Sequence, residues 1–291
     1  MLDNKCETFL AVSKFNNYTK AAKELNITQP AVSQHIKQLE DFYGVKLVNT
    51  TSKSVSLTSE GTLLKNALLF MQNDQNRLID IFSTPNNQTT KLKFGVTLTV
   101  GAFIIPDKLA EFIKMHPNIK AEMIVENTES LLTKLKQGEI DFAIVEGFFA
   151  KNEFNHKIFK KEAYVGVCSI SRCFESPVDF TDLLSENLII RESGSGTRDI
   201  FEKSLESHNL SVNDFNNIIE ISNIDAIKNM VAADAGITFM YKAAIKDELK
   251  RNLLQIIPII DYNPLHNITF ISPKRTCFSN EIEELYDFFK V

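Results

Sequence analysis

The sequence predicts a mixed α/β protein in three parts: a small helical N-terminal domain, one long helix and a two-lobed α/β body. Residues 3–43 place apolar side chains at helical spacing, and residues 59–82 continue that spacing without a proline. From residue 91 onward, strand-like apolar runs alternate with amphipathic helix-like runs, which is typical of a doubly wound parallel sheet. This alternation breaks after Phe154 and then starts again, so we expect two α/β lobes.

Composition indicates a protein of the cytoplasm with a charge asymmetry. The 291 residues are 44% apolar and 24% charged, and the N-terminal stretch has neither a basic segment nor the apolar run of a signal peptide. The net charge is −5, yet residues 1–65 hold eight lysines against six acidic residues. A mildly basic N-terminal part on an acidic body suggests a polyanionic partner for that part. Four scattered cysteines without CxxC spacing predict reduced thiols, and no Cys/His cluster suggests a metal site.

The N-terminal part is expected to fold as three helices followed by a two-stranded wing. After the helix over 3–16, Thr19 is expected to cap a short helix, and Thr28 to cap a longer one with Pro30 in its first turn. The apolar spacing turns one set of side chains of the longer helix inward, namely Ala31, Val32, Ile36, Leu39 and Phe42. Its other face carries short polar residues, as does a helix that enters a DNA major groove. After Gly44, two alternating runs fit the wing.

The stretch AAKELNITQPAVSQHIKQLEDFYGVKL, followed by VSLTSEG, resembles the winged helix-turn-helix of LysR-type transcriptional regulators over residues 5–65. The resemblance implies a double-stranded DNA operator as partner and RNA polymerase as a further one. It departs from the family pattern at His35, Val48 and Thr50, and the last removes an expected basic residue for which Lys53 can compensate. The predicted DNA-binding residues are Thr28, Gln29, Pro30, Ser33, Gln34, His35, Lys37 and Lys53.

Residues 59–82 carry a heptad seam that predicts a dimerisation helix. The spacing of the seam is 4-3-4-3-4, with one polar interruption, and its residues are Leu64, Leu68, Met71, Gln75, Leu78 and Phe82. The alternative is a helix that docks on its own domain. In the resembling family this helix pairs two subunits, and dimers assemble into tetramers, so we expect a homodimer and then a homotetramer. The domains are therefore expected at 1–58 (DNA-binding), 59–90 (dimerisation helix and linker) and 91–291 (effector-binding).

The body is expected to resemble periplasmic binding proteins and the effector domains of the same family. Lobe 1 would hold residues 91–162 and 269–291, and lobe 2 residues 163–268, with hinge crossings near 160–165 and 266–272. Ligands of such sheets lie outside the carboxyl ends of the strands. The residues found at those ends, and therefore predicted to bind the effector, are Thr97, Thr99, Asn127, Thr128, Glu146, Gly147, Ser193, Gly194, Ser195, Gly196 and Thr197.

The segment RESGSGTR (191–198) suggests the chemistry of the effector. It matches neither a Walker loop nor a GxSxG turn, but it resembles the RE.GSGTR stretch of a subset of LysR-type effector domains. Hydroxyls and backbone amides before a helix suit a carboxylate or another oxyanion, so we expect a small anionic metabolite and no cofactor. No arrangement of nucleophile and base predicts an enzyme. A two-lobed small-molecule-binding protein or enzyme without a gene-regulatory role remains the alternative.

Overall fold

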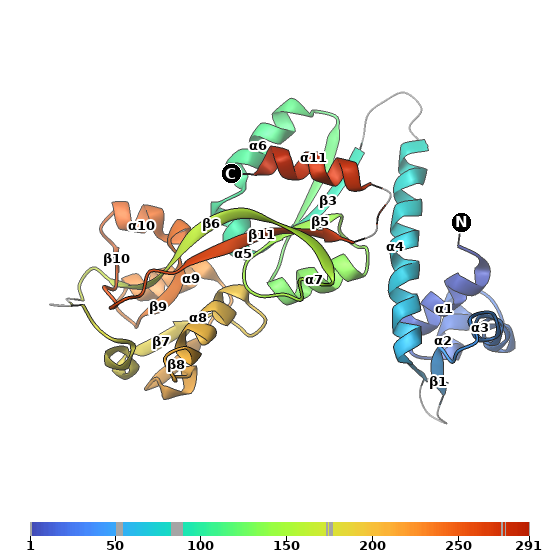
Figure 1. The fold of residues 1–291 in the computed structure, drawn as a ribbon, viewed down its shortest axis with the longest axis horizontal. Helices are drawn as coiled ribbons and strands as arrows, with labels where there is room; N and C mark the ends of the chain where they lie inside the picture. The colour runs from blue at the N-terminus through green and yellow to red at the C-terminus, as the bar shows by residue number, and fades with distance from the viewer. Residues whose placement is uncertain are drawn as a thin grey trace. The chain divides into compact units, whose positions relative to one another are not determined.

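The computed structural model describes residues 2–50, 55–82, 90–172, 174, 177–274, 276 and 278–290, apart from the side chains at 77, 80, 81 and 90 (Figure 1). The chain forms two compact units. The first contains Met1–Lys91 together with two short segments, Lys136–Glu139 and Arg275–Phe278, and the second contains the remaining residues. Each unit is described by itself.

The first unit is a winged helix-turn-helix with a long helix after it. Its elements are α1 (Asn4–Phe15), α2 (Tyr18–Glu24), α3 (Gln29–Tyr43), β1 (Val48–Thr50), β2 (Val55–Leu57) and α4 (Ser59–Phe82). The antiparallel pair β1–β2 is the wing. Phe9 and Val12 of α1, Ala21 of α2 and Val32 and Ile36 of α3 are buried together and form the core. Ala21 and the branched side chains of Val12, Val32 and Ile36 let the three helices approach closely around Phe9.

The helix caps and the orientation of Phe42 in this unit differ in part from the sequence prediction. Thr28 caps α3 as predicted, because its side chain accepts a hydrogen bond from the backbone N–H of Ala31. The predicted Thr19 cap is wrong, since α2 begins at Tyr18 and Asn17 caps it through a bond from the N–H of Lys20. Phe42 is also not inward: it is 80% exposed and contacts the Tyr43 ring edge-on.

The seam of α4 divides into two halves. Leu68 is buried in the core of the first unit, and Leu64 packs against that core. Gln75 accepts a hydrogen bond from the N–H of Leu2 at 3.1 Å. By contrast, Met71 and Phe82 are 58% and 73% exposed. The first half of the helix therefore docks on its own domain, and the second half presents apolar side chains that the unit itself does not cover.

The second unit contains two α/β lobes built on mixed sheets. Lobe 1 comprises β3 (Thr90–Val96), α5 (Leu98–Phe103), α6 (Pro106–Met115), β4 (Ile119–Val125), α7 (Thr128–Lys136), β5 (Phe142–Val145) and α11 (Ser279–Phe289). Lobe 2 comprises β7 (Asn187–Ile190), α8 (Gly196–Glu206), β8 (Asn217–Glu220), α9 (Ile224–Ala232), β9 (Thr238–Tyr241), α10 (Lys246–Lys250) and β10 (Leu254–Ile256). Short 3-10 turns occupy Phe180–Ser185, Val212–Asp214 and Lys242–Ile245.

Two long strands, β6 (Phe154–Ser169) and β11 (Leu265–Pro273), connect the lobes (Figure 1). The larger sheet has the order β10-β6-β11-β5-β3-β4, with β9 also paired to β6. β3 and β5 are parallel, as are β7 and β8. The two connecting strands are antiparallel to each other and to their neighbours, so the sheet is not purely parallel as the sequence suggested. β6 pairs with β11 through its first part and with β9 and β10 through its last part, which makes it common to both lobes.

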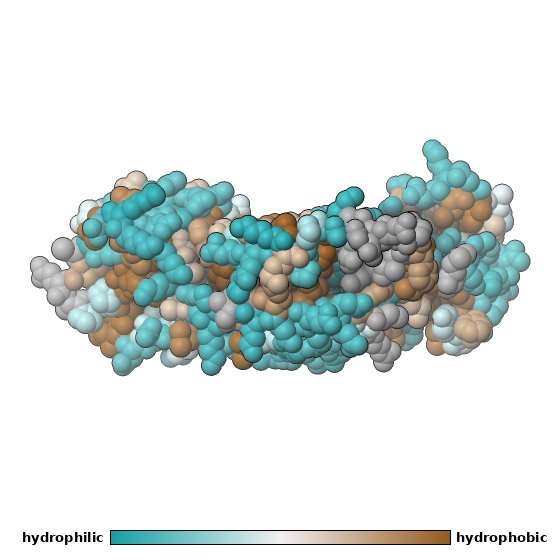
Figure 2. Space-filling view, turned by 90° about the horizontal axis from the view of Figure 1, so that it is seen from above, coloured by the Kyte–Doolittle hydropathy of each residue, from teal (hydrophilic) through white to brown (hydrophobic). Residues whose placement is uncertain are grey.

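Aromatic packing holds each lobe together and leaves the surface polar. Phe94, Phe142 and Phe270 are stacked in the core of lobe 1, with ring centroids 5.0 and 4.6 Å apart. Phe201 and Phe239 stack at 4.2 Å in lobe 2. Such ring pairs add to the stabilisation from buried area. Hydrophilic residues cover most of the face shown in Figure 2, and the apolar areas on it are separate from one another.

Candidate functional site

The N-terminal half of α3 presents most of the predicted DNA-binding residues to solvent. Gln29, Pro30, Gln34 and Lys37 are exposed. Ser33 is half-buried, and its Oγ accepts a hydrogen bond from the Nε2 of Gln29 at 3.1 Å. This pair lies one helical turn apart on one face, with hydroxyl and amide groups of the size that reads base edges.

His35 is placed differently from the sequence expectation. It is half-buried, and its Nδ1 lies 2.8 Å from the hydroxyl of Thr8 in α1. The same hydroxyl donates to the carbonyl of Asn4 at 2.6 Å. The reason is helical geometry, because a residue four positions before the buried Leu39 lies on the same side of the helix. His35 therefore joins α3 to α1 instead of facing outward.

The wing is attached to α3 by a residue that the sequence reading did not select, Glu40. Its Oε1 accepts hydrogen bonds from the N–H groups of Leu47 and Val48, and Lys46 donates to Oε2 at 2.6 Å. Burial opposes ionisation of Glu40, but these hydrogen bonds outweigh it and lower the pKa of the carboxyl. A glutamate within the apolar face of a helix was the available signal. Lys53, the predicted wing contact, lies outside the described residues.

Three of the predicted effector-binding residues meet where the two lobes touch. Glu146 follows β5 of lobe 1, and its Oε1 accepts hydrogen bonds from Thr99 of α5 at 3.1 Å and from Thr197 of α8 at 2.7 Å. Thr99 belongs to lobe 1 and Thr197 to lobe 2. One carboxylate oxygen is thus bonded to both lobes. We call this contact, Glu146 with Thr99 and Thr197, the interlobe seam.

Two glycines make this approach possible. A Cβ on Gly147 would lie 2.5 Å from the Cα of Gly196, and a Cβ on Gly196 would lie 2.2 Å from the carbonyl oxygen of Glu146. Gly147 also has a φ of +86°, which favours glycine. Thr128 of α7 supports the same turn, since its hydroxyl donates to the Glu146 carbonyl at 2.8 Å. Backbone therefore packs on backbone across the lobes.

The electrostatics of the interlobe seam are dominated by burial. Burial raises the pKa of Glu146, while hydrogen bonding from Thr197, the charge of Arg191 and hydrogen bonding from Thr99 oppose that rise. The Oε2 of Glu146 and the hydroxyl of Thr97 are buried without a hydrogen-bond partner among the described residues. Arg191 is 5% exposed and pairs with Glu192 through two contacts of 2.8 Å. Unpaired buried polar atoms are costly, so groups able to bond a ligand remain unused here.

The other predicted residues divide between turn geometry and the surface. Gly194 has a φ of +81° and lies beside Asn127. Asn127 accepts a hydrogen bond from the N–H of Ser130 at 2.9 Å. Ser195 is the buried N-cap residue of α8, and Ser193 is exposed. Next to the seam, Thr99, Arg191 and Thr197 line a cavity of about 10 Å³, which is the room of a single water molecule. This cavity therefore leaves no room for a metabolite in this structure.

Comparison with known protein families identifies both parts of the chain. Residues 4–62 match the bacterial regulatory helix-turn-helix protein, lysR family, and residues 85–290 match the LysR substrate binding domain. The second match covers more than half of the chain. The chain belongs to the LysR family of transcriptional regulators. It combines a DNA-binding helix-turn-helix with an effector-binding domain.

Individual relatives agree with this assignment. The HTH-type transcriptional activator CmpR of Synechocystis sp. is 30% identical over 240 residues, which cover 80% of this chain and 77% of that protein. The full-length LysR-type regulator LysG of Corynebacterium glutamicum, solved with bound effector Arg, has a TM-score of 0.71 at 13% identity and covers 99% of this chain and 98% of its own. The CcmR regulatory domain of Synechocystis, solved in complex with 2-PG, has a TM-score of 0.63 at 24% identity over 70% of this chain and 96% of its own.

The described part of this LysR-type regulator adds two negative findings. It contains no cluster of three or more His, Cys, Asp or Glu side chains that could hold a metal ion. It also contains no helix long and apolar enough to cross a membrane. Cys6 and Cys168 are free thiols, and burial raises the pKa of each to about 11. Cys173 and Cys277 lie outside the described residues.

Proposed function

We propose that this regulator binds a partly palindromic DNA operator as a homo-oligomer, and that a small anionic metabolite held between the lobes controls this binding. The observation that carries the proposal is the interlobe seam, where Glu146 bonds to Thr99 of one lobe and Thr197 of the other. A ligand changes DNA binding only by preferring one conformation. A seam that both lobes share is a place where a ligand can exert that preference.

The anionic character of the effector rests on the donors around the seam. Arg191 is a buried cation that a ligand would share with Glu192, and the hydroxyl of Thr97 has no partner among the described residues. The raised pKa of Glu146 favours its neutral form, which removes the repulsion that an ionised carboxyl would exert on an anion. The predicted residues of the RESGSGTR segment would add backbone amides when the lobes open to admit the ligand.

Oligomerisation is assigned to the second half of α4. Met71, Leu78 and Phe82 are exposed at positions of the predicted seam, whereas Leu64 and Leu68 pack on the first unit. Two copies of α4 would cover these side chains and give a homodimer, and pairs of dimers would give a tetramer. We also propose the domain boundaries that the sequence predicts, with the DNA-binding domain ending at residue 58 and the effector-binding domain beginning after residue 90. We propose that the regulator acts in the cytoplasm, where its DNA is located, and that RNA polymerase is a further partner. We propose no catalytic activity for it.

Selection of genomic DNA fragments with the full chain tests the DNA-binding part of the proposal. Ser33→Ala should relax sequence preference, because a good base contact contributes about 1–3 kcal/mol of discrimination. Glu7→Ala, at an exposed position of α1 outside the proposed reading helix, is the control and should leave preference unchanged. Equal enrichment of all fragments by the wild type, or an unchanged preference in Ser33→Ala, would contradict the assignment of α3 as the reading helix.

A further inference from the structure

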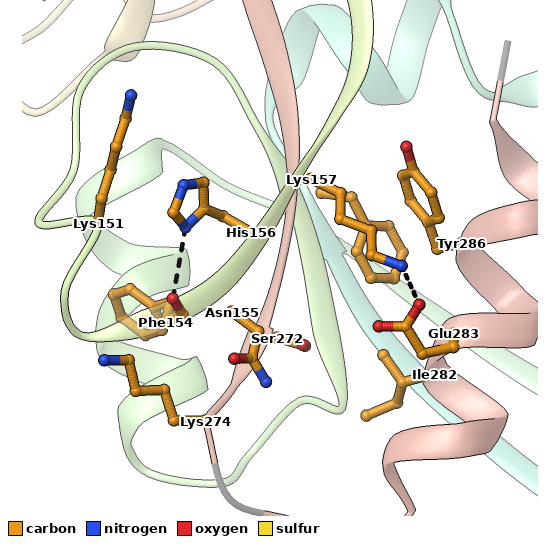
Figure 3. Close-up of a pocket in the computed structure, with 11 residues that line it drawn as sticks. Lys151, Phe154, Asn155, His156, Lys157, Ser272, Lys274, Ile282, Glu283 and Tyr286 are labelled. Atoms are coloured by element: carbon orange, nitrogen blue, oxygen red, sulfur yellow. Dashed lines mark hydrogen bonds and ion pairs between the residues drawn. The ribbon is translucent and has the colours of Figure 1, made fainter.

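Lobe 1 contains a cavity of about 500 Å³ that is separate from the interlobe seam (Figure 3). It lies between the beginning of β6, the end of β11 and α11. Its volume is in the range of sites for small molecules, roughly 300–1,000 Å³. None of the residues of the interlobe seam, Thr99, Glu146 and Thr197, lines this cavity. The cavity is therefore a second place where a ligand can bind.

The walls of the cavity combine an apolar floor with a basic rim. Phe154, Phe270 and Ile282 are buried and form part of the floor. Lys151 and Lys274 lie on the rim and are exposed. In Figure 3 these two lysines flank His156 on one side of the view, while the pair formed by Lys157 and Glu283 lies on the other side. The rim is thus divided into a neutralised part and a basic part.

The basic part of the rim has charge to offer a ligand. Lys157 is paired with Glu283 and lies 4.8 Å from the centre of the Tyr286 ring. Lys151 and Lys274 form no ion pair among the residues that the structure describes, and Glu283 is the only acidic residue of the cavity lining. A surplus of two lysines stands out in a chain of net charge −5. Two unpaired ammonium groups complement two negative charges.

Polar groups between the lysines complete the site. Ser272 lines the cavity and is 8% exposed. Asn155 donates its Nδ2–H to the carbonyl of Pro273 at 3.0 Å, which holds its side chain against the end of β11. His156 provides a ring nitrogen besides the Nδ1 that lies 3.5 Å from the carbonyl of Phe154. A hydroxyl and an imidazole beside two cations favour an oxyanion over an apolar ligand.

We propose that this cavity is a second small-molecule site, which binds a small dianion such as a phosphate monoester or a dicarboxylate between Lys151 and Lys274. The floor limits the ligand to a compact body, and the lysines contact its two charges. Because the cavity is built from lobe 1 alone, a ligand there can bind in any relative position of the lobes. The inference does not depend on what the interlobe seam binds.

Calorimetric titration of the full chain with inorganic phosphate and with succinate, at constant ionic strength, tests this site. The titrations are made at a pH above the second pKa of phosphoric acid, where both probes carry two charges, and acetate serves as the singly charged reference. Lys151→Gln/Lys274→Gln should weaken phosphate or succinate binding roughly ten- to a hundredfold, as expected for the loss of charge-assisted hydrogen bonds. Lys114→Gln/Lys120→Gln removes two exposed lysines outside the cavity and should leave the affinity unchanged.

The position of the bound anion is checked with the Cε1 proton of His156 in the NMR spectrum, assigned by its loss in His156→Asn. We expect this resonance to shift on titration with the same apparent Kd as the calorimetry. Binding of one probe alone would narrow the class to phosphate esters or to dicarboxylates. Any of three results would overturn the proposal. They are unchanged dianion affinity in Lys151→Gln/Lys274→Gln, a His156 resonance that does not shift on titration, and no heat with either dianion beyond that of acetate.

Discussion

Replacing Glu146 by Gln should change how the stability of the effector-binding unit depends on pH. Glu146 is 1% exposed, and its Oε1 accepts hydrogen bonds from both lobes. Glutamine keeps the shape and this acceptor but does not titrate. Burial raises the pKa of Glu146 above the ordinary value of 4.5. The folded protein therefore holds a proton that the unfolded chain releases between those two pKa values.

The direction and size of the effect follow from this proton. Stability from the raised pKa is fully present below pH 4.5 and is lost as the pH rises through the pKa of the folded state. In that window the free energy of unfolding of the wild type should fall relative to that of the variant by up to about 1.4 kcal/mol per pH unit. For a unit of this size, such a change shifts the melting temperature by about 3–6 °C per pH unit.

Differential scanning calorimetry of the full chain at a series of pH values measures this difference. Glu206→Gln is a suitable control, because Glu206 is exposed on the same helix that carries Thr197. The control should follow the wild type at every pH. The melting temperature of Glu146→Gln minus that of the wild type should rise as the pH increases above 4.5. Parallel curves for all three proteins would mean that Glu146 titrates as an ordinary carboxyl, and the buried seam would be refuted.

Two further predictions concern the dimer and the lobes. Met71 is 58% exposed, so Met71→Lys should leave the first unit folded yet shift its sedimentation toward that of a monomer. Asn76→Lys changes an exposed polar position and should leave the sedimentation unchanged. A wild type that sediments as a monomer at micromolar concentration would contradict the dimer. A Cβ at position 147 would lie 2.5 Å from the Cα of Gly196, so Gly147→Ala should widen the distance between the lobes. Small-angle scattering would show this as a larger radius of gyration. An unchanged radius would mean that the lobes do not need this contact.

The N-terminal domain was the most predictable part of the fold, because its signals are local. The Thr28 cap, the position of Pro30 and the apolar spacing of α3 depend on neighbouring residues, and the structure shows the helix at Gln29–Tyr43. The orientations of His35 and Phe42 were less predictable. The contact of His35 with Thr8 depends on how α1 packs on α3 and not on the spacing alone, whereas Phe42 near the end of α3 is 80% exposed and contacts the Tyr43 ring.

Other features required the tertiary structure. The sequence placed Thr99, Glu146 and Thr197 at strand ends, but their meeting at one carboxylate oxygen depends on how the lobes approach. The cavity on lobe 1 joins Lys151 and Lys274, which are more than a hundred positions apart in the chain, and no local pattern links them. The division of the α4 seam also escaped prediction, since Leu68 and Met71 look alike in a heptad but pack differently.

The coupling between effector and DNA is tested most directly with Thr97→Val. The Thr97 side chain is 2% exposed and its hydroxyl has no hydrogen-bond partner in the described part of the chain, so valine removes a donor while nearly preserving shape and fold. Operator affinity is measured for wild type and variant with and without a metabolite that stabilises the wild type in a thermal-shift screen. We expect unchanged affinity without the metabolite and a reduced response with it. A Thr97→Val protein that responds as the wild type does would place the effector elsewhere and contradict control through the interlobe seam.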